Sequence, residues 1–543
     1  MKKLIYIILL FGIILLPNKT YANETVSAQG SNQQLYLNDK NQNTVGFNID
    51  DYNYYRLRDL ASMLKTENFN FSLWGDDKEI KVTMYKKYNE DETPKVINKV
   101  GEKKMAIKKP ILLTLTKNDN TTSQEILVYN IDGYNYFRLR DIGAILGFDV
   151  DYNEVRNEAQ IFTRDFERKP VETTKKVILG NERLLEDFSY LVDGKKVGLI
   201  TNQTGIDSKG IRTVDKLFNH NNSELIAIYS PEHGLDGLHK AGEYVESYTD
   251  TQLNLPVFSL YGKTREPSKE MLKGIDVLIF DIQDIGSRTY TYVSTMNYAM
   301  KAAKKAGIEI VVLDRPNPVG GEIVEGFVLE DKYKTFVGVD NTPMAHGMTA
   351  GELANFYNRN INAKLTVVPM ENYKRSMIWQ DTNLPFAQTS PNIPDITSAF
   401  NYMATGIGDG TGLGQGYKFA WVGSKTLNSE EYARKLNSYN LPGVIFTPED
   451  NKDRGGVRLR ITDYHKYNPQ KTGTYILATA NLLGDINIPR EINGEIPMFE
   501  KIHGTNKMGR ALLNKQSPEE IIESYQDELD EFKEIRKNYL IYD

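Results

Sequence analysis

A carboxylate and an imidazole stand side by side at the end of an apolar run near the middle of the chain. Residues 225–230 read Leu-Ile-Ala-Ile-Tyr-Ser, and Pro231 then precedes Glu232 and His233. A short β-branched run of this kind is typical of a buried parallel strand, after which the polar pair would lie in a loop. Because carboxylates and imidazoles are commonly used for proton transfer, we expect acid–base chemistry at Glu232 and His233.

Two more apolar runs end in acids in the same way. Residues 277–280 lead into Asp281 and Asp284, and residues 308–313 lead into Asp314. Ligands of open α/β sheets bind outside the carboxyl ends of the strands. We therefore expect the three strand ends to converge on one cleft, with Asp281 and Asp284 available for acid–base work or for binding hydroxyl groups.

The segments around these residues alternate between strand and helix patterns, which predicts a parallel sheet with helices on both faces. This is the layering of a Rossmann-like α/β domain. No Gly-x-Gly-x-x-Gly follows the first strand, so no nicotinamide cofactor is expected. That strand leads instead into Asn202 and Gln203, whose amides suit neutral polar groups such as those of a sugar. Strands are expected at 196–200, 225–229, 257–260, 277–280 and 308–313, and helices at 213–218, just after 267–268 and at 293–306.

Beyond residue 350 the pattern predicts a smaller C-terminal α/β lobe that packs over the strand ends. A helix at 350–358 and a strand at 365–368 precede loops rich in proline and glycine, and a strand at 456–462 and an amphipathic helix at about 518–537 follow. The glycine-rich stretch 406–416 is not closed by Gly-Lys-Ser/Thr, so nucleotide binding is not expected.

An internal repeat precedes residue 165. Residues 51–60 (Asp-Tyr-Asn-Tyr-Tyr-Arg-Leu-Arg-Asp-Leu) return as residues 133–142 (Gly-Tyr-Asn-Tyr-Phe-Arg-Leu-Arg-Asp-Ile). Each copy reads as a hairpin, a helix capped near its aspartate and a second hairpin. The repeat resembles the copper amine oxidase N-terminal-like stalk domain, but no histidine precedes His220, so no copper site is expected. We expect a wall-facing spacer or binding module, whose arginines and tyrosines either pack the hairpins or touch glycan.

The N-terminus and the composition predict the compartment and the partners. Lys2 and Lys3 precede an apolar run over residues 4–16, with cleavage sites after Ala22 or Ala28, as in a secretory signal peptide; an uncleaved anchor is the alternative. The chain has 66 basic and 72 acidic residues and no long basic block, so nucleic acid is not an expected partner. It has no cysteine, which excludes disulfides, cysteine metal sites and a thiol nucleophile. We expect an exported protein without a transmembrane segment in its mature chain.

These patterns divide the chain into five parts. The fold class is α/β for the catalytic part, preceded by an α+β module. The predicted parts are a signal peptide (1–28), the duplicated copper amine oxidase N-terminal-like module (29–165), a polar linker (166–176), the Rossmann-like catalytic domain (177–375) and the C-terminal α/β lobe (376–543).

Eight short motifs lie between residues 197 and 472. They are Gly-Leu-Ile-Thr-Asn-Gln-Thr-Gly at 198–205, Tyr-Ser-Pro-Glu-His-Gly at 229–234, Ser-Leu-Tyr-Gly at 259–262, Asp-Ile-Gln-Asp-Ile-Gly-Ser-Arg at 281–288, Asp-Arg-Pro-Asn-Pro-Val-Gly-Gly at 314–321, Glu-Gly at 325–326, His-Gly-Met-Thr at 346–349 and Ser-Pro-Asn-Ile-Pro at 390–394. Together they resemble the NamZ-type exo-β-N-acetylmuramidases, glycosidases that remove terminal N-acetylmuramic acid from peptidoglycan fragments. The resemblance implies a Rossmann-like domain and a smaller lobe, with the active site in the cleft between them. The family usually has an arginine in the loop that corresponds to residues 409–419, which are shorter and lack one, so substrate length or aglycone preference is expected to differ.

The resemblance also implies chemical roles. Glycoside hydrolysis needs a proton donor and a second group at an oxocarbenium-like centre. Glu232 is the expected donor, His233 is expected to orient it or to bind the sugar, and Asp281 or Asp284 is the expected second group. Muramic acid carries a lactyl carboxylate, for which Arg288 or Arg315 is the expected ligand. The other candidate substrate-binding residues are Asn202, Gln203, Tyr261, Gln283, Tyr290, Asp314, Asn317, Glu325, His346 and Asn392.

Two other functions fit the same residues. One is a non-catalytic peptidoglycan-binding cell-wall protein. The other is a metal hydrolase built on Glu232, His233, His346 and Asp281, which is disfavoured because adjacent residues rarely share one ion and no histidine pair has i, i+4 spacing. We therefore expect an exo-acting muramidase of cell-wall turnover that needs no metal or cofactor.

Overall fold

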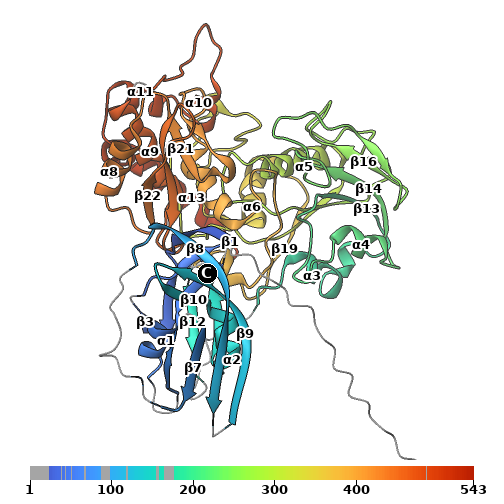
Figure 1. Cartoon of the computed structure of the whole chain (residues 1–543). Coiled ribbons are helices and arrows are strands. Elements are labelled where there is room, and N and C mark those ends of the chain that lie inside the picture. The colour runs from blue at the N-terminus through green and yellow to red at the C-terminus, as the bar shows by residue number, and fades with distance from the viewer. Residues whose placement is uncertain are drawn as a thin grey trace, which may run out of the picture. The chain divides into compact units, whose positions relative to one another are not determined.

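The computed structural model describes residues 24–37, 40–42, 44–50, 52–65, 69–76, 78–86, 88, 98–117, 120–153, 158–163, 176–484 and 486–543 (Figure 1). The chain divides into two compact units, Met1–Val171 and Glu172–Asp543. The predicted signal peptide up to residue 23 and the predicted linker except Lys176 lie outside the described residues. No described helix has the length and apolar content needed to span a membrane.

The first unit contains a sheet in the order β1-β4-β5-β10-β9-β8-β7-β6. Because β1 pairs with β8 as well as with β4, the strands β1, β4, β5, β10, β9 and β8 close into a ring. The strands are β1 (Glu24–Gly30), β4 (Phe47–Ile49), β5 (Tyr52–Arg56), β6 (Phe71–Gly75), β7 (Glu79–Met84), β8 (Lys103–Lys117), β9 (Asn120–Ile131) and β10 (Tyr134–Arg138). A smaller sheet has the order β11 (Asp149–Asn153), β12 (Glu158–Phe162), β2 (Gln34–Leu37) and β3 (Lys40–Gln42).

The two copies of the sequence repeat form the same local structure. Strand β5 leads into α1 (Leu57–Met63), and β10 leads into α2 (Leu139–Leu146). The two strands pair antiparallel, and leucines of both helices enter one core. The aspartates do not cap the helices as expected: each helix begins after an arginine, and Asp59 lies in the first turn, where it pairs with Arg56. Beyond the helices the copies differ, since β7 joins β8 in the large sheet and β12 joins β2 in the small one.

The second unit is built on a sheet in the order β15-β16-β14-β13-β17-β18-β19, in which all strands except β15 are parallel. Counted along the chain without β15, the parallel strands have the order 3-2-1-4-5-6. The strands are β13 (Lys196–Thr201), β14 (Glu224–Ser230), β15 (Tyr248–Asp250), β16 (Leu255–Ser259), β17 (Val277–Asp281), β18 (Glu309–Leu313) and β19 (Leu365–Val368).

Side chains alternate between the two faces of this sheet, and each face is covered by helices. On β17, Val277 and Ile279 belong to a core with α3 (Gly180–Glu186) and α4 (Thr213–Phe218), whereas Leu278 and Phe280 belong to a core with α5 (Tyr292–Ala306) and α6 (Ala350–Ile361). Figure 1 shows these helices beside the sheet. A strand whose side chains are buried on both faces has a continuous apolar sequence, which is why these strands could be predicted from the sequence.

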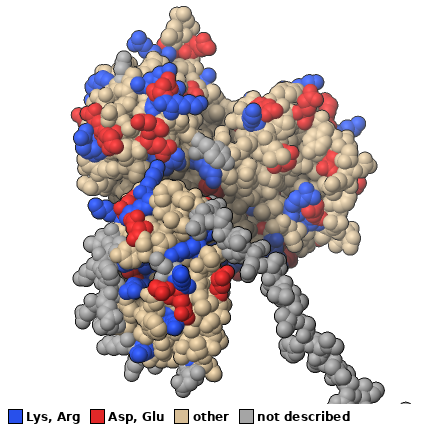
Figure 2. All heavy atoms as spheres, viewed as in Figure 1, with Lys and Arg blue, Asp and Glu red and all other residues tan. Residues whose placement is uncertain are grey.

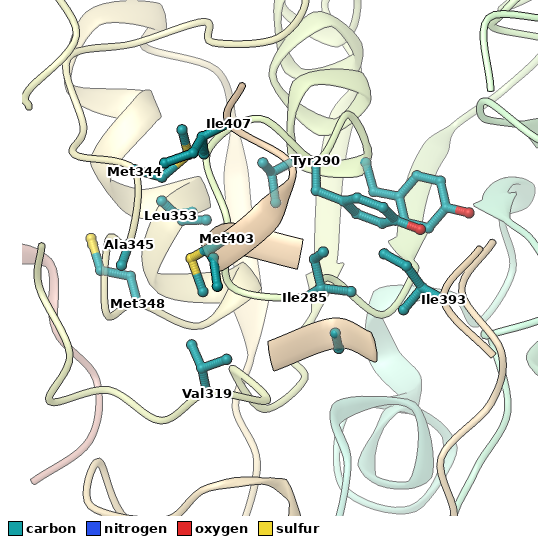
Figure 3. Close-up of a cluster of buried hydrophobic side chains, with 14 of the residues drawn as sticks. Ile285, Tyr290, Val319, Met344, Ala345, Met348, Leu353, Ile393, Met403 and Ile407 are labelled. Atoms are coloured by element: carbon teal, nitrogen blue, oxygen red, sulfur yellow. The ribbon is translucent and has the colours of Figure 1, made fainter. Parts of the chain in front are cut away.

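The remainder of the second unit carries an antiparallel sheet and several helices. The sheet has the order β20 (Gly414–Gln415), β21 (Trp421–Ser424), β23 (Gly455–Ile461) and β22 (Val444–Pro448). The helices are α7 (Ile396–Thr405), α8 (Ser429–Ser438), α9 (Pro469–Leu483), α10 (Met498–His503), α11 (Lys507–Leu513), α12 (Pro518–Glu523) and α13 (Gln526–Arg536). Figure 3 shows Met403 and Ile407 of this part among Val319, Met344 and Leu353, so one apolar core joins it to the parallel sheet.

Two helix predictions were wrong. The segment after Ser268 forms turns and no regular helix. Gly274 has a left-handed backbone conformation (φ 81°), which ends the helical turn that begins at Ser268. The expected helix over 518–537 is broken into α12 and α13 at Tyr525, which is fully buried against Phe327.

Candidate active site

The loop after β14 holds Glu232 against the start of α5. Its side chain is only 7% exposed. The carboxylate accepts hydrogen bonds from the Gly242 backbone N–H on Oε1 (2.9 Å) and from the Thr291 hydroxyl on Oε2 (2.6 Å). Thr291 is the residue that precedes α5. Two elements that are far apart in the sequence therefore fix the position of this carboxylate.

His233 has a left-handed backbone conformation (φ 72°), which is uncommon for a residue other than glycine. The loop folds back on it, since the His239 N–H donates to the His233 carbonyl (3.2 Å). Nδ1 of His233 lies 2.6 Å from the His239 carbonyl, and because a carbonyl can only accept, Nδ1 is the donor of this hydrogen bond. Unusual backbone conformations of this kind concentrate at functional sites.

Glu232 and His233 line a pocket of about 710 Å³. This volume lies in the range of small-molecule sites. Of the other residues proposed from the sequence, Tyr261, Tyr290 and Asn392 line it too. Further lining residues are Lys240, Ala241, Arg265, Thr289, Thr291, Thr335, Phe336, Val337, Ser390, Pro391, Ile393, Tyr402, Phe419, Met498 and Lys501. The pocket is thus formed between the loops of the parallel sheet and the C-terminal part of the same unit.

The tyrosines of the pocket are hydrogen-bond donors at neutral pH. Burial raises the pKa of Tyr261, and the charge of Glu232 raises it further, against the opposing effect of Arg265. Burial also raises the pKa of Tyr402 to about 12 and that of Tyr290 above its ordinary range. Phenol groups with raised pKa keep their protons, so they can donate to hydroxyl or carbonyl oxygens of a ligand.

Asp281, the last residue of β17, and Asp314, which follows β18, do not line this pocket. Asp281 is fully buried, and its Oδ1 accepts from Nε of Arg315 (2.6 Å). Its Oδ2 accepts from the Thr213 hydroxyl (2.6 Å). Asp314 is also fully buried and accepts from the Tyr542 hydroxyl (2.6 Å), among other donors. The structure places Asp281 and Arg315 in an internal ion pair that links neighbouring strands, and neither residue lines the pocket.

Arg288, the other arginine expected to bind a carboxylate, is also used internally. It is 2% exposed, and its guanidinium donates to the carbonyls of Phe327 (3.0 Å), Thr342 (2.8 Å) and Ile502 (2.6 Å). These bonds tie the loop after β17 to α10. The residue is conspicuous in the sequence because it follows a strand end, but its partners are backbone carbonyls, which no sequence pattern identifies.

Asp284 and His346 face each other in the interior. Nε2 of His346 lies 3.8 Å from Oδ2 of Asp284, and neither Nε2 nor Oδ1 has a hydrogen-bond partner. Burial raises the pKa of Asp284 to about 7. Burial, helped by the charges of Arg536 and Arg288, lowers the pKa of His346 to about 3. The imidazole is therefore neutral at pH 7, and the contact is not an ion pair.

The remaining candidates stabilise the loops at the carboxyl edge of the sheet. Asn202 accepts from the backbone and hydroxyl of Thr204. Gln203 and Gln283 each donate to two backbone carbonyls, Asn317 donates to the Met348 carbonyl, and Glu325 accepts from Asn468. None of these five lines the pocket.

Sequence reasoning missed several residues of the pocket wall, above all Arg265, Phe336 and Tyr402. Arg265 follows Tyr261 by four residues, close to the Ser-Leu-Tyr-Gly motif, and this proximity was the one available signal. Phe336 and Tyr402 come from irregular or distant segments that carry no local pattern. Among the described residues, Glu232 is the one carboxylate on the wall, and no cluster of three or more histidine or acidic side chains is arranged to hold a metal ion.

Comparison with known proteins agrees with this architecture. The family description "Exo-beta-N-acetylmuramidase NamZ, N-terminal" matches residues 197–397, and its C-terminal counterpart matches residues 400–542. A peptidoglycan beta-N-acetylmuramidase NamZ of Bacillus subtilis (strain 168) is 44% identical over 382 residues, covering 68% of this chain and 92% of the relative.

Solved structures of two DUF1343 family proteins of Bacteroides fragilis are also similar. One has 36% identity and a TM-score of 0.61, and the other has 28% identity and a TM-score of 0.51. Each comparison covers 68% of this chain and 99% of the solved chain. The pocket residues Glu232 to Lys501 fall within the segments that the two family descriptions match. The chain therefore belongs to the NamZ family of exo-β-N-acetylmuramidases.

Proposed function

We propose that this protein is a glycoside hydrolase that removes terminal β-1,4-linked N-acetylmuramic acid from the non-reducing end of peptidoglycan fragments during cell-wall turnover. The observation that carries the proposal is the position of Glu232, held by two hydrogen bonds on the wall of a pocket with room for a sugar. The B. subtilis relative, which the chain matches over most of that protein's length, supports the same reaction.

In this mechanism Glu232 gives its proton to the glycosidic oxygen. The Gly242 N–H can only donate, so the proton is carried on Oε2. The Thr291 hydroxyl can accept a hydrogen bond from the protonated acid and donate one to the carboxylate. It therefore has a hydrogen bond to Glu232 both before and after the proton is transferred. Tyr261, Tyr290 and Tyr402 also line the pocket, where the Tyr402 hydroxyl is hydrogen-bonded to Thr289 (3.2 Å). As placed, Asp281 and Asp284 do not supply a second carboxylate to the pocket.

The test is release of 4-nitrophenol from a 4-nitrophenyl β-N-acetylmuraminide and from the corresponding glucosaminide. We expect release from the muraminide. For Glu232→Gln we expect kcat to fall by about 10²- to 10⁴-fold, the usual contribution of a general acid, on a β-1,4-linked disaccharide whose sugar leaving group needs a proton, and by less on the nitrophenyl substrate, whose leaving group departs readily without one. The thermal unfolding midpoint of the variant should match the wild type. A folded wild type that releases nitrophenol from neither substrate would favour the non-catalytic peptidoglycan-binding function.

We also infer a finer fold assignment. The 3-2-1-4-5-6 order of parallel strands with helices on both faces supports a Rossmann-like class for the catalytic part. The paired strand–helix units β5–α1 and β10–α2 support an internal duplication and a copper amine oxidase N-terminal-like module in the first unit.

For the first unit we propose contact with cell-wall glycan. A pocket of about 290 Å³ is lined by Arg56, Trp74, Tyr134 and Asn135 among others, and Trp74 is 61% exposed. Solvent-exposed tryptophan beside polar groups suits stacking against a sugar ring. In a Glu232→Gln background, Trp74→Ala should lower co-sedimentation with purified cell walls, and equal co-sedimentation would reject the contact.

We propose secretion as well, on the basis of the basic and apolar N-terminal sequence. Of the two cleavage positions, the one after Ala22 suits the fold. Cleavage after Ala28 would remove Glu24 to Ala28, which pair with β8. N-terminal sequencing of the exported protein tests this choice.

A further inference from the structure

We propose that Arg265 binds the lactyl carboxylate of the terminal N-acetylmuramic acid and thereby selects muramic acid over glucosamine termini. This inference rests on the proposed hydrolysis at the Glu232 pocket. N-acetylmuramic acid differs from N-acetylglucosamine by a lactyl ether on C3, which ends in a carboxylate. A pocket that prefers the muramide has to offer that anion a cation, and guanidinium binds carboxylates with two parallel hydrogen bonds.

The guanidinium of Arg265 is positioned and incompletely satisfied. It lies 3.9 Å from the ring centroid of Tyr261 and 4.5 Å from that of Phe336. Its Nη1 is buried and has no hydrogen-bond partner. Within the part of the chain that the structure describes, no carboxylate forms an ion pair with it. A buried N–H without a partner costs free energy, which a ligand carboxylate would remove.

The other cations near the pocket fit this role less well. Arg288 and Arg315, the two expected from the sequence, are buried away from the pocket wall. Arg288 donates to backbone carbonyls, although its Nε has no partner, and Arg315 pairs with Asp281. Lys240 is exposed, and Lys501 is half-buried on α10. Among the described residues, no aromatic ring lies under either lysine as Tyr261 and Phe336 lie against Arg265, so neither lysine is held in one geometry before the ligand arrives.

Arg265 lies at a suitable place relative to Glu232, because Tyr261 stands next to both. The Tyr261 ring contacts the guanidinium, and the charges of Glu232 and Arg265 act on its hydroxyl in opposite directions. On the sugar, the glycosidic oxygen is on C1 and the lactyl ether is on C3 of the same ring. One sugar bound with its C1 oxygen at Glu232 can therefore present its carboxylate to Arg265, with Tyr261 in between.

The experiment compares two substrates that differ only in this charge. They are 4-nitrophenyl β-N-acetylmuraminide and the same compound with its lactyl carboxyl converted to a primary amide. For the wild type we expect kcat/KM to be about 10- to 150-fold higher on the acid, the range for a hydrogen bond to a charged group. Arg265→Met keeps the bulk without the charge and should abolish that preference, and Arg265→Lys should restore part of it.

Lys240→Met and Lys501→Met are the matched controls, and both should keep the preference of the wild type. Binding is measured separately by calorimetry with N-acetylmuramic acid and its amide, using Glu232→Gln, with and without Arg265→Met. This arm needs no turnover, so it decides the role of Arg265 even if the proposed hydrolysis fails. The inference is overturned if folded Arg265→Met keeps its preference for the acid, or if Lys501→Met loses it.

Discussion

Glu232 and Asp281 occupy the same kind of position, at the carboxyl ends of β14 and β17, the two strands on either side of β13, yet their surroundings differ. Each accepts a 2.6 Å hydrogen bond from a threonine hydroxyl, Thr291 for Glu232 and Thr213 for Asp281. The second oxygen of Asp281 is paired with Arg315 in the interior, whereas that of Glu232 accepts from the Gly242 backbone N–H, at the wall of a pocket. A strand end is therefore a necessary but not a sufficient sign of a catalytic acid.

The difference has a physical cause. At the end of β17, Asp281 is fully buried, and a buried charge is tolerated only if it is paired, as Asp281 is with Arg315. The loop after β14 surrounds a pocket, so the carboxylate of Glu232 keeps one side for a ligand.

On the surface that Figure 2 shows, basic and acidic side chains are interspersed and form no single large patch of one sign.

The largest expected effect is on stability, which should depend on Asp281. Asp281→Ala leaves the buried guanidinium of Arg315 unpaired, so it should lower the free energy of unfolding by about 3–5 kcal/mol. The measurement is urea unfolding followed by the fluorescence of Trp379 and Trp421 in a Trp74→Phe background. Adding Arg315→Met should recover part of the loss, because it removes the unpaired charge. A stable Asp281→Ala variant without turnover would instead support the catalytic role predicted from the sequence.

A smaller effect should appear in the pH dependence of stability through Asp284. Its ordinary pKa is 3.8, and burial raises the pKa to about 7 in the folded protein. Between these pH values the folded state keeps a proton that the unfolded chain has released, so the free energy of unfolding falls as pH rises. Asp284→Asn stays neutral at every pH.

Relative to the wild type, Asp284→Asn should therefore gain on the order of 2–3 kcal/mol between pH 5 and pH 8. Unfolding curves of both proteins at the two pH values give this difference. A constant difference across the range would show that Asp284 does not titrate in this window, and Glu309→Gln, a partly exposed acid with a lowered pKa, is a control that should not gain over this range.

The smallest effect compares the two threonines. Thr291→Val removes a hydroxyl from Glu232 and should lower kcat about 5- to 10-fold with little change in stability, since one such bond is worth about 1 kcal/mol. Thr213→Val removes the matching hydroxyl from Asp281 and should lower stability by about 1–2 kcal/mol without changing kcat. Activity assays and unfolding curves on both variants test the pair. Equal effects of both variants on kcat would end the distinction between the two acids.

Much of the parallel sheet could be predicted because its signal is local. The strand at 365–368 and the helix at 213–218 have the predicted bounds, and α5 closes at Gly307 as expected. Continuous apolar runs report burial on both faces, and a glycine that can adopt φ 71° ends a helix whatever surrounds it. The antiparallel sheet around β21 and β22 was not predicted, since its strands are short and lie among glycine-rich loops.

For the site, the sequence by itself determined that an acid and an imidazole follow a buried strand, and Glu232 and His233 do line the pocket. It did not determine which of the other acids and arginines find partners inside the protein. Asp281 pairs with Arg315, and Arg288 donates to three backbone carbonyls. Arg288 and Arg265 each keep one buried N–H without a partner, but of the two only Arg265 lines the pocket. Tertiary structure decided this, because the pairing of charges depends on distances between segments that are far apart in the chain, and a local pattern carries no information about those distances.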